Sequence, residues 1–226
     1  MELIIFDCDG VLVDSEAVYV DAELQFLADA GVRFERTAYM RAFMGLAPDE
    51  WRKRLGAEMQ ARTGRPIAAD FFGSLDAFVT RALATRLRAL PGARDAIGGL
   101  DMLRCVASST PLERLRWKLQ HTGLLDLFAP HVFSAEMVPR GKPAPDLFLH
   151  AAASLGVDPR RCVVVEDSVN GVLAGRAAGM RVIGLTAGAH CLDGHAAALQ
   201  AGGADVVIDT FADLRPALSG LSHIAI

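Results

Sequence analysis

Short, continuously apolar segments alternate with helix-like segments over most of the 226-residue chain. Apolar runs of this length are typical of strands buried on both faces, and their alternation with helices favours a parallel sheet between two helical layers. The expected strands are Leu3–Phe6, Leu103–Ala107, His131–Phe133, Cys162–Val165, Val182–Leu185 and Val206–Ile208. The expected helices are Leu112–Thr122, Pro145–Leu155, Val169–Ala178, Gly194–Gln200 and Ala212–Leu218. We therefore predict an α/β fold with a three-layer core, whose functional residues collect at the carboxyl ends of the strands.

Residues 15–89 interrupt this alternation. They show no convincing strand pattern, and glycine and proline punctuate their helix-like periodicity. The expected helices are Glu16–Ala30, Asp49–Thr63 and Phe71–Leu90. A purely helical stretch of this length is too long for an ordinary crossover between two strands. We therefore predict an α/β core formed by residues 1–14 and 90–226, and an inserted α-helical cap domain formed by residues 15–89.

The composition excludes several other classes of protein. Hydrophobic residues make up 52% of the chain and charged residues 22%, and the net charge of −4 gives no basic footprint for nucleic acid. The apolar runs are too short to span a membrane, and the N-terminus lacks the basic start of a secretion signal. The four cysteines have no CxxC spacing, so we expect small reduced thiols, mostly buried. We predict a cytoplasmic protein, monomeric or a weak homo-oligomer, that binds neither nucleic acid nor a membrane.

A pair of carboxylates follows the first predicted strand. Side chains at positions i and i+2 of extended chain point the same way, so Asp7 and Asp9 should converge. Two close carboxylates resist double ionisation unless a cation or a shared proton offsets their repulsion. The pattern fits a divalent metal site, and it also fits two solvated aspartates in the turn before Gly10.

Hydroxyl groups and a lysine follow later strands. Ser108, Ser109 and Thr110 come directly after the second predicted strand, where they could bind a phosphate or simply cap the next helix. Lys142 lies in a stiff, proline-flanked turn that could hold its ammonium group against an anion. An ordinary surface lysine is the alternative at that position.

Two adjacent carboxylates, Glu166 and Asp167, follow the fourth predicted strand. They could bind a metal ion, or they could complement the positive N-terminal end of the next helix. Gly171, Gly175 and Gly179 recur every four residues in that helix and predict one slim face that packs closely on the sheet.

Two histidines raise the question of a second metal site. His190 and His195 are five residues apart with Gly194 between them, so they do not share a helix face. We expect a polar loop near the site rather than a metal centre.

Four segments, taken in order, resemble the haloacid dehalogenase-like superfamily, and most closely its β-phosphoglucomutase-like branch. They are D-x-D-G-V-L-V-D-S at Asp7–Ser15, the strand-end Ser108, G-K-P-A-P-D at Gly141–Asp146, and E-D-S-x-x-G at Glu166–Gly171 followed by A-G-M at Ala178–Met180. The resemblance covers essentially the whole chain, and its last two strings are long and specific. It implies a Rossmann-like core sheet with a helical cap inserted after the first strand.

The resemblance also implies a phosphoric monoester hydrolase that uses Mg²⁺ and acts on a small phosphorylated metabolite. Asp7 would attack the phosphorus and form an aspartyl-phosphate, and Asp9 would protonate the leaving oxygen and then activate water. The implied Mg²⁺ ligands are the Asp7 carboxylate, the Asp9 backbone carbonyl, Asp167, and Glu166 either directly or through water. Ser108 and Lys142 would hold the phosphate oxygens, assisted by backbone N–H groups such as that of Ser109.

The cap should decide between two reactions. Mutases of this branch use a histidine on the first cap helix and an arginine after the cap's glycine loop. The corresponding positions here are Tyr19 and Pro48, and neither carries a positive charge, so we favour a phosphatase over a sugar phosphomutase. Met44, Gly45 and Leu46 are expected to bind substrate by facing the leaving group, and Tyr19 is expected to bind substrate as well.

Within the branch, the resemblance is closest to phosphatases of sugar phosphates and of sugar acids such as 6-phosphogluconate. A sugar phosphomutase remains the alternative, and a non-catalytic phosphate-binding module is a third. Such a module would be expected to have lost Asp7 or Asp9, whereas this chain retains both.

Overall fold

The computed structural model describes residues 1–46 and 48–222 and divides the chain into two compact units. One unit comprises residues 1–14 together with the chain from Arg88 onward, and the other comprises Ser15–Leu87. None of the helices in the described part of the chain has the length and apolar character needed to cross a membrane.

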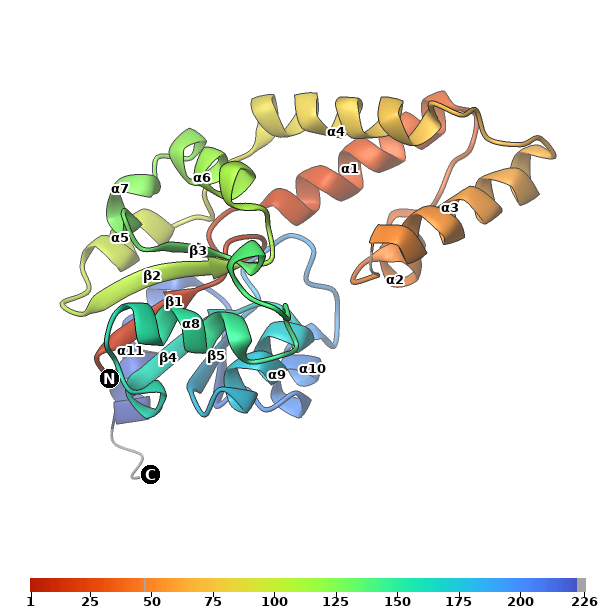
Figure 1. Ribbon diagram of the computed structural model, residues 1–226. Helices are drawn as coiled ribbons and strands as arrows, with labels where there is room; N and C mark the ends of the chain where they lie inside the picture. Colours follow the sequence, from red (N-terminus) through yellow and green to blue (C-terminus); the bar gives the residue numbers. More distant parts are fainter. Residues whose placement is uncertain (47, 223–226) are drawn as a thin grey trace. The chain divides into compact units, whose positions relative to one another are not determined.

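A six-stranded parallel sheet forms the centre of the first unit (Figure 1). Its order is β3-β2-β1-β4-β5-β6, so β1 lies between β2 and β4 and the strand order reverses beside it. The strands are β1 Leu3–Phe6, β2 Leu103–Ser108, β3 Val132–Ser134, β4 Cys162–Glu166, β5 Arg181–Leu185 and β6 Val206–Ile208. All the predicted strands are confirmed, with ends shifted by a residue at most. Because the pairings are parallel, the carboxyl ends of the strands meet at one edge of the sheet.

Alternate side chains of each strand point to opposite faces of the sheet and pack against different helices. On one face, Leu3 and Ile5 belong to a buried cluster that includes side chains of α8, α9 and α10. On the other face, Phe6 makes an edge contact with Phe128 of α7, with 5.8 Å between ring centroids. The helices of this unit are α5 Ala93–Gly98, α6 Leu112–His121, α7 Leu125–Phe128, α8 Asp146–Ser154, α9 Val169–Ala177, α10 His195–Ala201 and α11 Leu214–Ser222, with short 3₁₀ helices at Ala135–Met137, Pro159–Arg161 and Phe211–Asp213. This is the predicted three-layer α/β core.

The second unit is helical, and its described residues contain no strand. Its helices are α1 Ser15–Asp29, α2 Arg36–Phe43, α3 Pro48–Thr63 and α4 Phe71–Arg86. Helices α1 and α4 pack together through Phe26, whose ring centroid lies 5.5 Å from that of Phe71 and 5.7 Å from that of Phe78. An ion pair of 2.8 Å between Arg86 and Asp21 joins the same two helices.

Helix α2 was not among the helices expected from the sequence. Eight residues give too few repeats for a period of 3.6 to be recognised, and its N-cap is a glutamate rather than the usual small polar residue. The Glu35 carboxylate accepts hydrogen bonds from the N–H groups of Thr37 at 2.8 Å and Ala38 at 2.6 Å. The Tyr39 and Phe43 rings pack 4.7 Å apart on this helix.

The predicted helix Phe71–Leu90 is wrong in its last turn, because α4 ends at Arg86. Beyond that point the backbone joins the first unit, where the carbonyl of Arg88 accepts a hydrogen bond from the N–H of Asp14 at 3.1 Å. This pairing ends the helix where local preference would continue it. The junction between the units therefore lies after Leu87, two residues before the predicted boundary.

The predicted glycine face of α9 is only partly present. A side chain at Gly175 would lie 2.7 Å from Val182, so this glycine does allow close packing on the sheet. Gly179 instead follows the end of α9 with a φ of 73° and has open space around it. It ends the helix in the left-handed conformation that glycine adopts readily, so its predicted packing role is wrong.

Candidate active site

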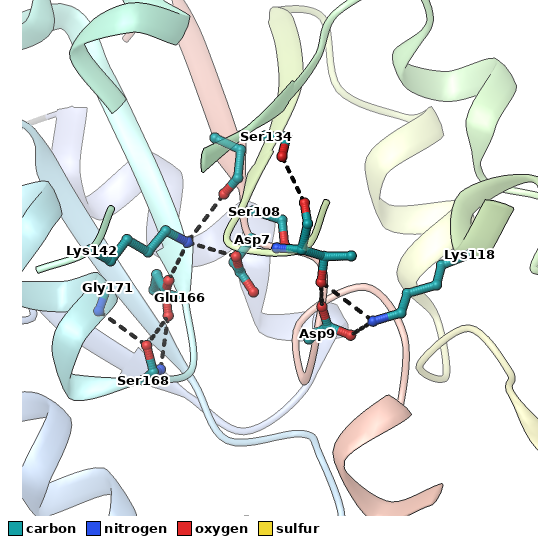
Figure 2. Close-up of polar contacts among 11 residues, drawn as sticks. Asp7, Asp9, Ser108, Lys118, Ser134, Lys142, Glu166, Ser168 and Gly171 are labelled. Atoms are coloured by element: carbon teal, nitrogen blue, oxygen red, sulfur yellow. Dashed lines mark hydrogen bonds and ion pairs between the residues drawn. The ribbon is translucent and has the colours of Figure 1, made fainter. Parts of the chain in front are cut away.

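Side chains from three neighbouring strand ends meet at the carboxyl edge of the sheet (Figure 2). Asp7 follows β1, Ser108 ends β2 and Glu166 ends β4. Figure 2 shows Lys142 reaching the same place from the loop before α8. Ligand sites of open α/β sheets form where the strand order reverses, and β1 and β4 flank that point here.

The Lys142 ammonium group is buried between two carboxylates. Its Nζ atom lies 2.6 Å from Oδ1 of Asp7 and 2.7 Å from Oε1 of Glu166, and it donates to the carbonyl of Ala107 at 3.1 Å. Burial alone would lower the pKa of Lys142, but the two carboxylates raise this pKa above its usual value. Lys142 is therefore a fixed positive charge within the site and not a surface lysine.

Glu166 uses both of its carboxylate oxygens on protein partners. Its Oε1 faces Lys142, while its Oε2 accepts hydrogen bonds from the Ser168 N–H at 2.8 Å and the Ser168 hydroxyl at 2.9 Å. The same Ser168 hydroxyl caps α9 by accepting from the Gly171 N–H at 3.0 Å. A side chain at Gly171 would overlap the Glu166 carboxylate, so this arrangement requires a glycine.

Asp9 is held by two side chains whose contact with it was not predicted. The Thr110 hydroxyl donates to Oδ2 of Asp9 at 2.6 Å, and the Lys118 ammonium forms an ion pair with Oδ1. The Lys118 side chain is only 1% exposed. The sequence held one signal for it: Lys118 lies between Leu115 and Leu119, on the apolar face of α6.

The hydroxyl residues after β2 have three different environments. Ser108 is buried, and its oxygen accepts a hydrogen bond from the Thr110 N–H at 3.1 Å, which leaves the hydroxyl hydrogen to donate. The Thr110 carbonyl accepts from the Ser134 hydroxyl at 2.8 Å, while Ser109 is exposed. The N-cap of α6 is Pro111, and the Leu112 N–H donates to the Glu136 carboxylate at 2.8 Å. The capping alternative for Ser108 is therefore wrong, and its binding of phosphate stays a prediction.

Asp167 contacts two histidines from the segment after β5. Nε2 of His190 lies 2.8 Å from Oδ2 of Asp167, and Nε2 of His195 lies 2.6 Å from the Asp167 backbone carbonyl oxygen. The polar loop expected from the sequence thus lies at this edge of the sheet, directly beside one of the predicted metal ligands.

Burial raises the pKa of Asp7 to about 7. Lys142 acts against this increase, while the charges of Glu166 and Asp9 add to it. Burial also raises the pKa of Cys8 between the two aspartates, so this thiol stays protonated. A further positive charge beside Asp7 would therefore favour its ionised form.

The side chains at this edge fit a hard divalent cation. Four carboxyl groups lie there with only two ammonium groups. They belong to Asp7, Asp9, Glu166 and Asp167, and to Lys118 and Lys142. Gly10 provides room beside them, because a side chain there would overlap the Asp167 carboxylate. Carboxylate oxygens are the protein ligands that Mg²⁺ prefers.

The other predicted site residues belong to the helical unit. Tyr19 lies on α1, Met44 is the C-cap residue after α2, and Gly45 follows in the left-handed conformation with a φ of 75°. Leu46 comes next, and Pro48 begins α3. The substrate-binding roles of Tyr19, Met44, Gly45 and Leu46 stay predictions.

Residues 1–179 match the haloacid dehalogenase-like hydrolase family. The chain belongs to this family. The matched region includes the ends of β1, β2 and β4, and the resemblance inferred from the four segments is confirmed.

Named relatives and solved structures agree with the family assignment. Hexitol phosphatase B of Escherichia coli is 38% identical to this hydrolase over 190 residues, covering 79% of this chain and 81% of the relative. The 6-phosphogluconate phosphatase of Escherichia coli is 29% identical over 190 residues, covering 84% and 85%. A haloacid dehalogenase family hydrolase from Deinococcus radiodurans, solved with bound phosphate and sodium, has a TM-score of 0.84 and 33% identity, covering 98% of this chain and 96% of that one.

Proposed function

We propose that this haloacid dehalogenase-like hydrolase is a Mg²⁺-dependent phosphatase of small phosphorylated metabolites, of the sugar phosphate or sugar-acid phosphate class. The observation that carries the proposal is the buried Asp7 carboxylate, which lies at the end of β1 with the Lys142 ammonium 2.6 Å away. The similarity to hexitol and 6-phosphogluconate phosphatases supports the substrate class.

In the first half of the reaction, an oxygen of Asp7 attacks the phosphorus and the bond to the substrate alcohol breaks. The Ser108 hydroxyl would donate its hydrogen to a phosphate oxygen, and the Lys142 ammonium, 2.6 Å from the attacking carboxylate, would offset the charge that develops on the phosphate. Asp9 gives its proton to the leaving alcohol oxygen. The products are the free alcohol and an aspartyl-phosphate on Asp7.

In the second half, Asp9 takes a proton from water, and the water oxygen attacks the phosphorus of the aspartyl-phosphate. Inorganic phosphate leaves and the Asp7 carboxylate is restored. The Lys118 ammonium forms an ion pair with one oxygen of Asp9. Thr110 holds the other oxygen of the same carboxylate, so the proton-transfer group keeps one orientation.

Asp7, the Asp9 backbone carbonyl and Asp167 would hold the Mg²⁺ ion. When bound, the ion supplies positive charge that favours ionised Asp7 and binds phosphate oxygen. The oxygens of Glu166 are engaged by Lys142 and Ser168, so we infer that it acts by orienting Lys142 or through a water, not as a direct ligand.

The test is phosphate release from a panel of hexitol phosphates, hexose phosphates and phosphorylated sugar acids, with Mg²⁺ and with EDTA. We expect Mg²⁺-dependent release by the wild type and none by Asp7→Asn. Asp209→Asn is the matched control, because Asp209 also follows a strand of this sheet but pairs with the Thr186 hydroxyl at 2.6 Å. Full activity of Asp7→Asn, or of the wild type in EDTA, would overturn the proposal. Little phosphate release together with a need for a bisphosphate primer would identify a mutase instead.

A further inference from the structure

The His190 ring is buried beside Asp167. It is only 5% exposed, and its Nε2 lies 2.8 Å from Oδ2 of Asp167. A carboxylate oxygen accepts hydrogen bonds, so Nε2 carries the hydrogen in this contact. Its Nδ1 is buried without a hydrogen-bond partner among the described residues. The ring therefore contacts Asp167 through Nε2, which also lies 3.5 Å from Sγ of Cys191.

His195 contacts the backbone of the same residue. Its Nε2 lies 2.6 Å from the backbone carbonyl oxygen of Asp167, which accepts the hydrogen bond. The two histidine rings make an edge contact with 5.8 Å between their centroids. Together they bind both the side chain and the main chain of Asp167, which determines the direction of its carboxylate.

Two glycines leave room for the contact between His190 and Asp167. A side chain at Gly10 would overlap the Asp167 carboxylate and lie 2.7 Å from Cε1 of His190. A side chain at Gly188 would lie 2.5 Å from Nδ1 of His190. The loop after β1 and the loop after β5 thus both lack side chains where the imidazole and the carboxylate meet. A side chain at Gly10 or at Gly188 would displace the His190 ring, so the ring can occupy this position only because both loops have a glycine there.

A metal site made of His190, Cys191 and His195 is the competing interpretation. Their ligand atoms lie within 4.8 Å of one another, a spacing that a soft metal ion could bridge. However, Nε2 of each histidine already donates to Asp167. Coordination through these nitrogens would break both hydrogen bonds, so the geometry favours support of Asp167.

We propose that His190 and His195 are positioning residues that hold Asp167 in the direction required of a Mg²⁺ ligand. The proposal rests on the proposed function, which makes Asp167 a ligand. Partners that orient a metal-binding side chain reduce the motion it loses on coordination, and their removal typically weakens metal binding about 10- to 100-fold. The histidines act only through Asp167 and do not touch the substrate.

The test measures the Mg²⁺ dissociation constant by calorimetry and the melting temperature in EDTA. In His190→Leu and in His195→Leu we expect Mg²⁺ binding to weaken about 10- to 100-fold. In His190→Gln, whose amide N–H₂ can reach the place of Nε2, most of the affinity should return. His121→Leu is the control, because His121 is exposed and stacks on Trp117. His195 is only partly buried, so its variants keep the test decisive if His190→Leu does not fold.

Wild-type Mg²⁺ affinity in both leucine variants would overturn the inference, and so would a lower melting temperature in EDTA with an unchanged dissociation constant. Stoichiometric zinc in the wild type that is lost in Cys191→Ser would overturn it in favour of the competing metal site. If the wild type itself bound no Mg²⁺, the metal site of the proposed function would fail, which is a distinct result.

Discussion

Lys142 and Asp7 are 135 residues apart in the chain, yet they form a 2.6 Å ion pair with side chains only 5% and 10% exposed. The attraction within a buried ion pair gains little more free energy than is lost when its two charges leave water. Removal of one partner, however, leaves an uncompensated buried charge. Lys142 is shared with Glu166, so its loss would expose two carboxylates to each other.

Lys142→Met should therefore lower both stability and activity. We expect a loss of roughly 3–5 kcal/mol in the free energy of unfolding, measured with urea at pH 7.5 without metal. Phosphate release should fall by about 10²–10³-fold, because a group that offsets charge in the transition state is lost. Lys53→Met, which changes an exposed lysine on α3, should alter neither quantity.

Gly171→Ala should damage the site without touching a catalytic group. The added methyl group would overlap the Glu166 carboxylate and push it away from Lys142. We expect kcat to fall by at least about 10-fold, as for other lost supporting contacts, together with a lower melting temperature. The control is Gly73→Ala on α4, where a methyl group meets only open space. It should keep kcat and stabilise the protein by about 0.5–1 kcal/mol. Equal effects of the two substitutions would contradict the role assigned to Gly171.

Lys118→Met should destabilise the protein through Asp9. The lysine is fully buried against this carboxylate, so its removal should cost roughly 3–5 kcal/mol in urea unfolding. In an Asp9→Asn background the same substitution should cost clearly less, because no buried charge is left without a partner. Additive effects of the two substitutions would show that the ion pair contributes no coupling energy.

Glu23 should make stability depend on pH. Burial raises the pKa of this carboxyl from 4.5 to about 7, against the opposing hydrogen bond from the Tyr39 hydroxyl at 2.9 Å. Between these pH values the folded state holds a proton that the unfolded state has released, so the free energy of unfolding falls as pH rises through this window. The full effect is up to about 3 kcal/mol.

Glu23→Gln removes the ionisation and keeps an oxygen that accepts from Tyr39. The free energy of unfolding of this variant should equal that of the wild type at about pH 4.5. The difference should then increase in favour of the variant up to about pH 8, as measured by urea unfolding at several pH values. Glu58→Gln, which changes an exposed carboxylate paired with Arg62 in the same unit, should show no such trend. A pH-independent difference for Glu23→Gln would refute the raised pKa.

Local patterns were enough to predict the strands, the helical insert and the family. Leu3–Phe6 and Cys162–Val165 are recognisable because a strand buried on both faces must be apolar at every position. Helix α2 was missed because eight residues do not show a period, and α4 was extended too far because its end depends on pairing between Arg88 and Asp14. Helix ends are decided by such long-range contacts more than by the preferences of the residues themselves.

The amino-acid sequence by itself was enough to predict Asp7, Asp9, Lys142 and Asp167 as site residues, because the segments that contain them, taken in order, resemble the motifs of the family. Only the tertiary structure decided which groups support them. Lys118 and His190 lie far along the chain from their partners Asp9 and Asp167, and local spacing cannot specify a contact made across the sheet. Burial also limits which contacts can form, because a charged or polar side chain in the interior must be paired to offset the cost of leaving water.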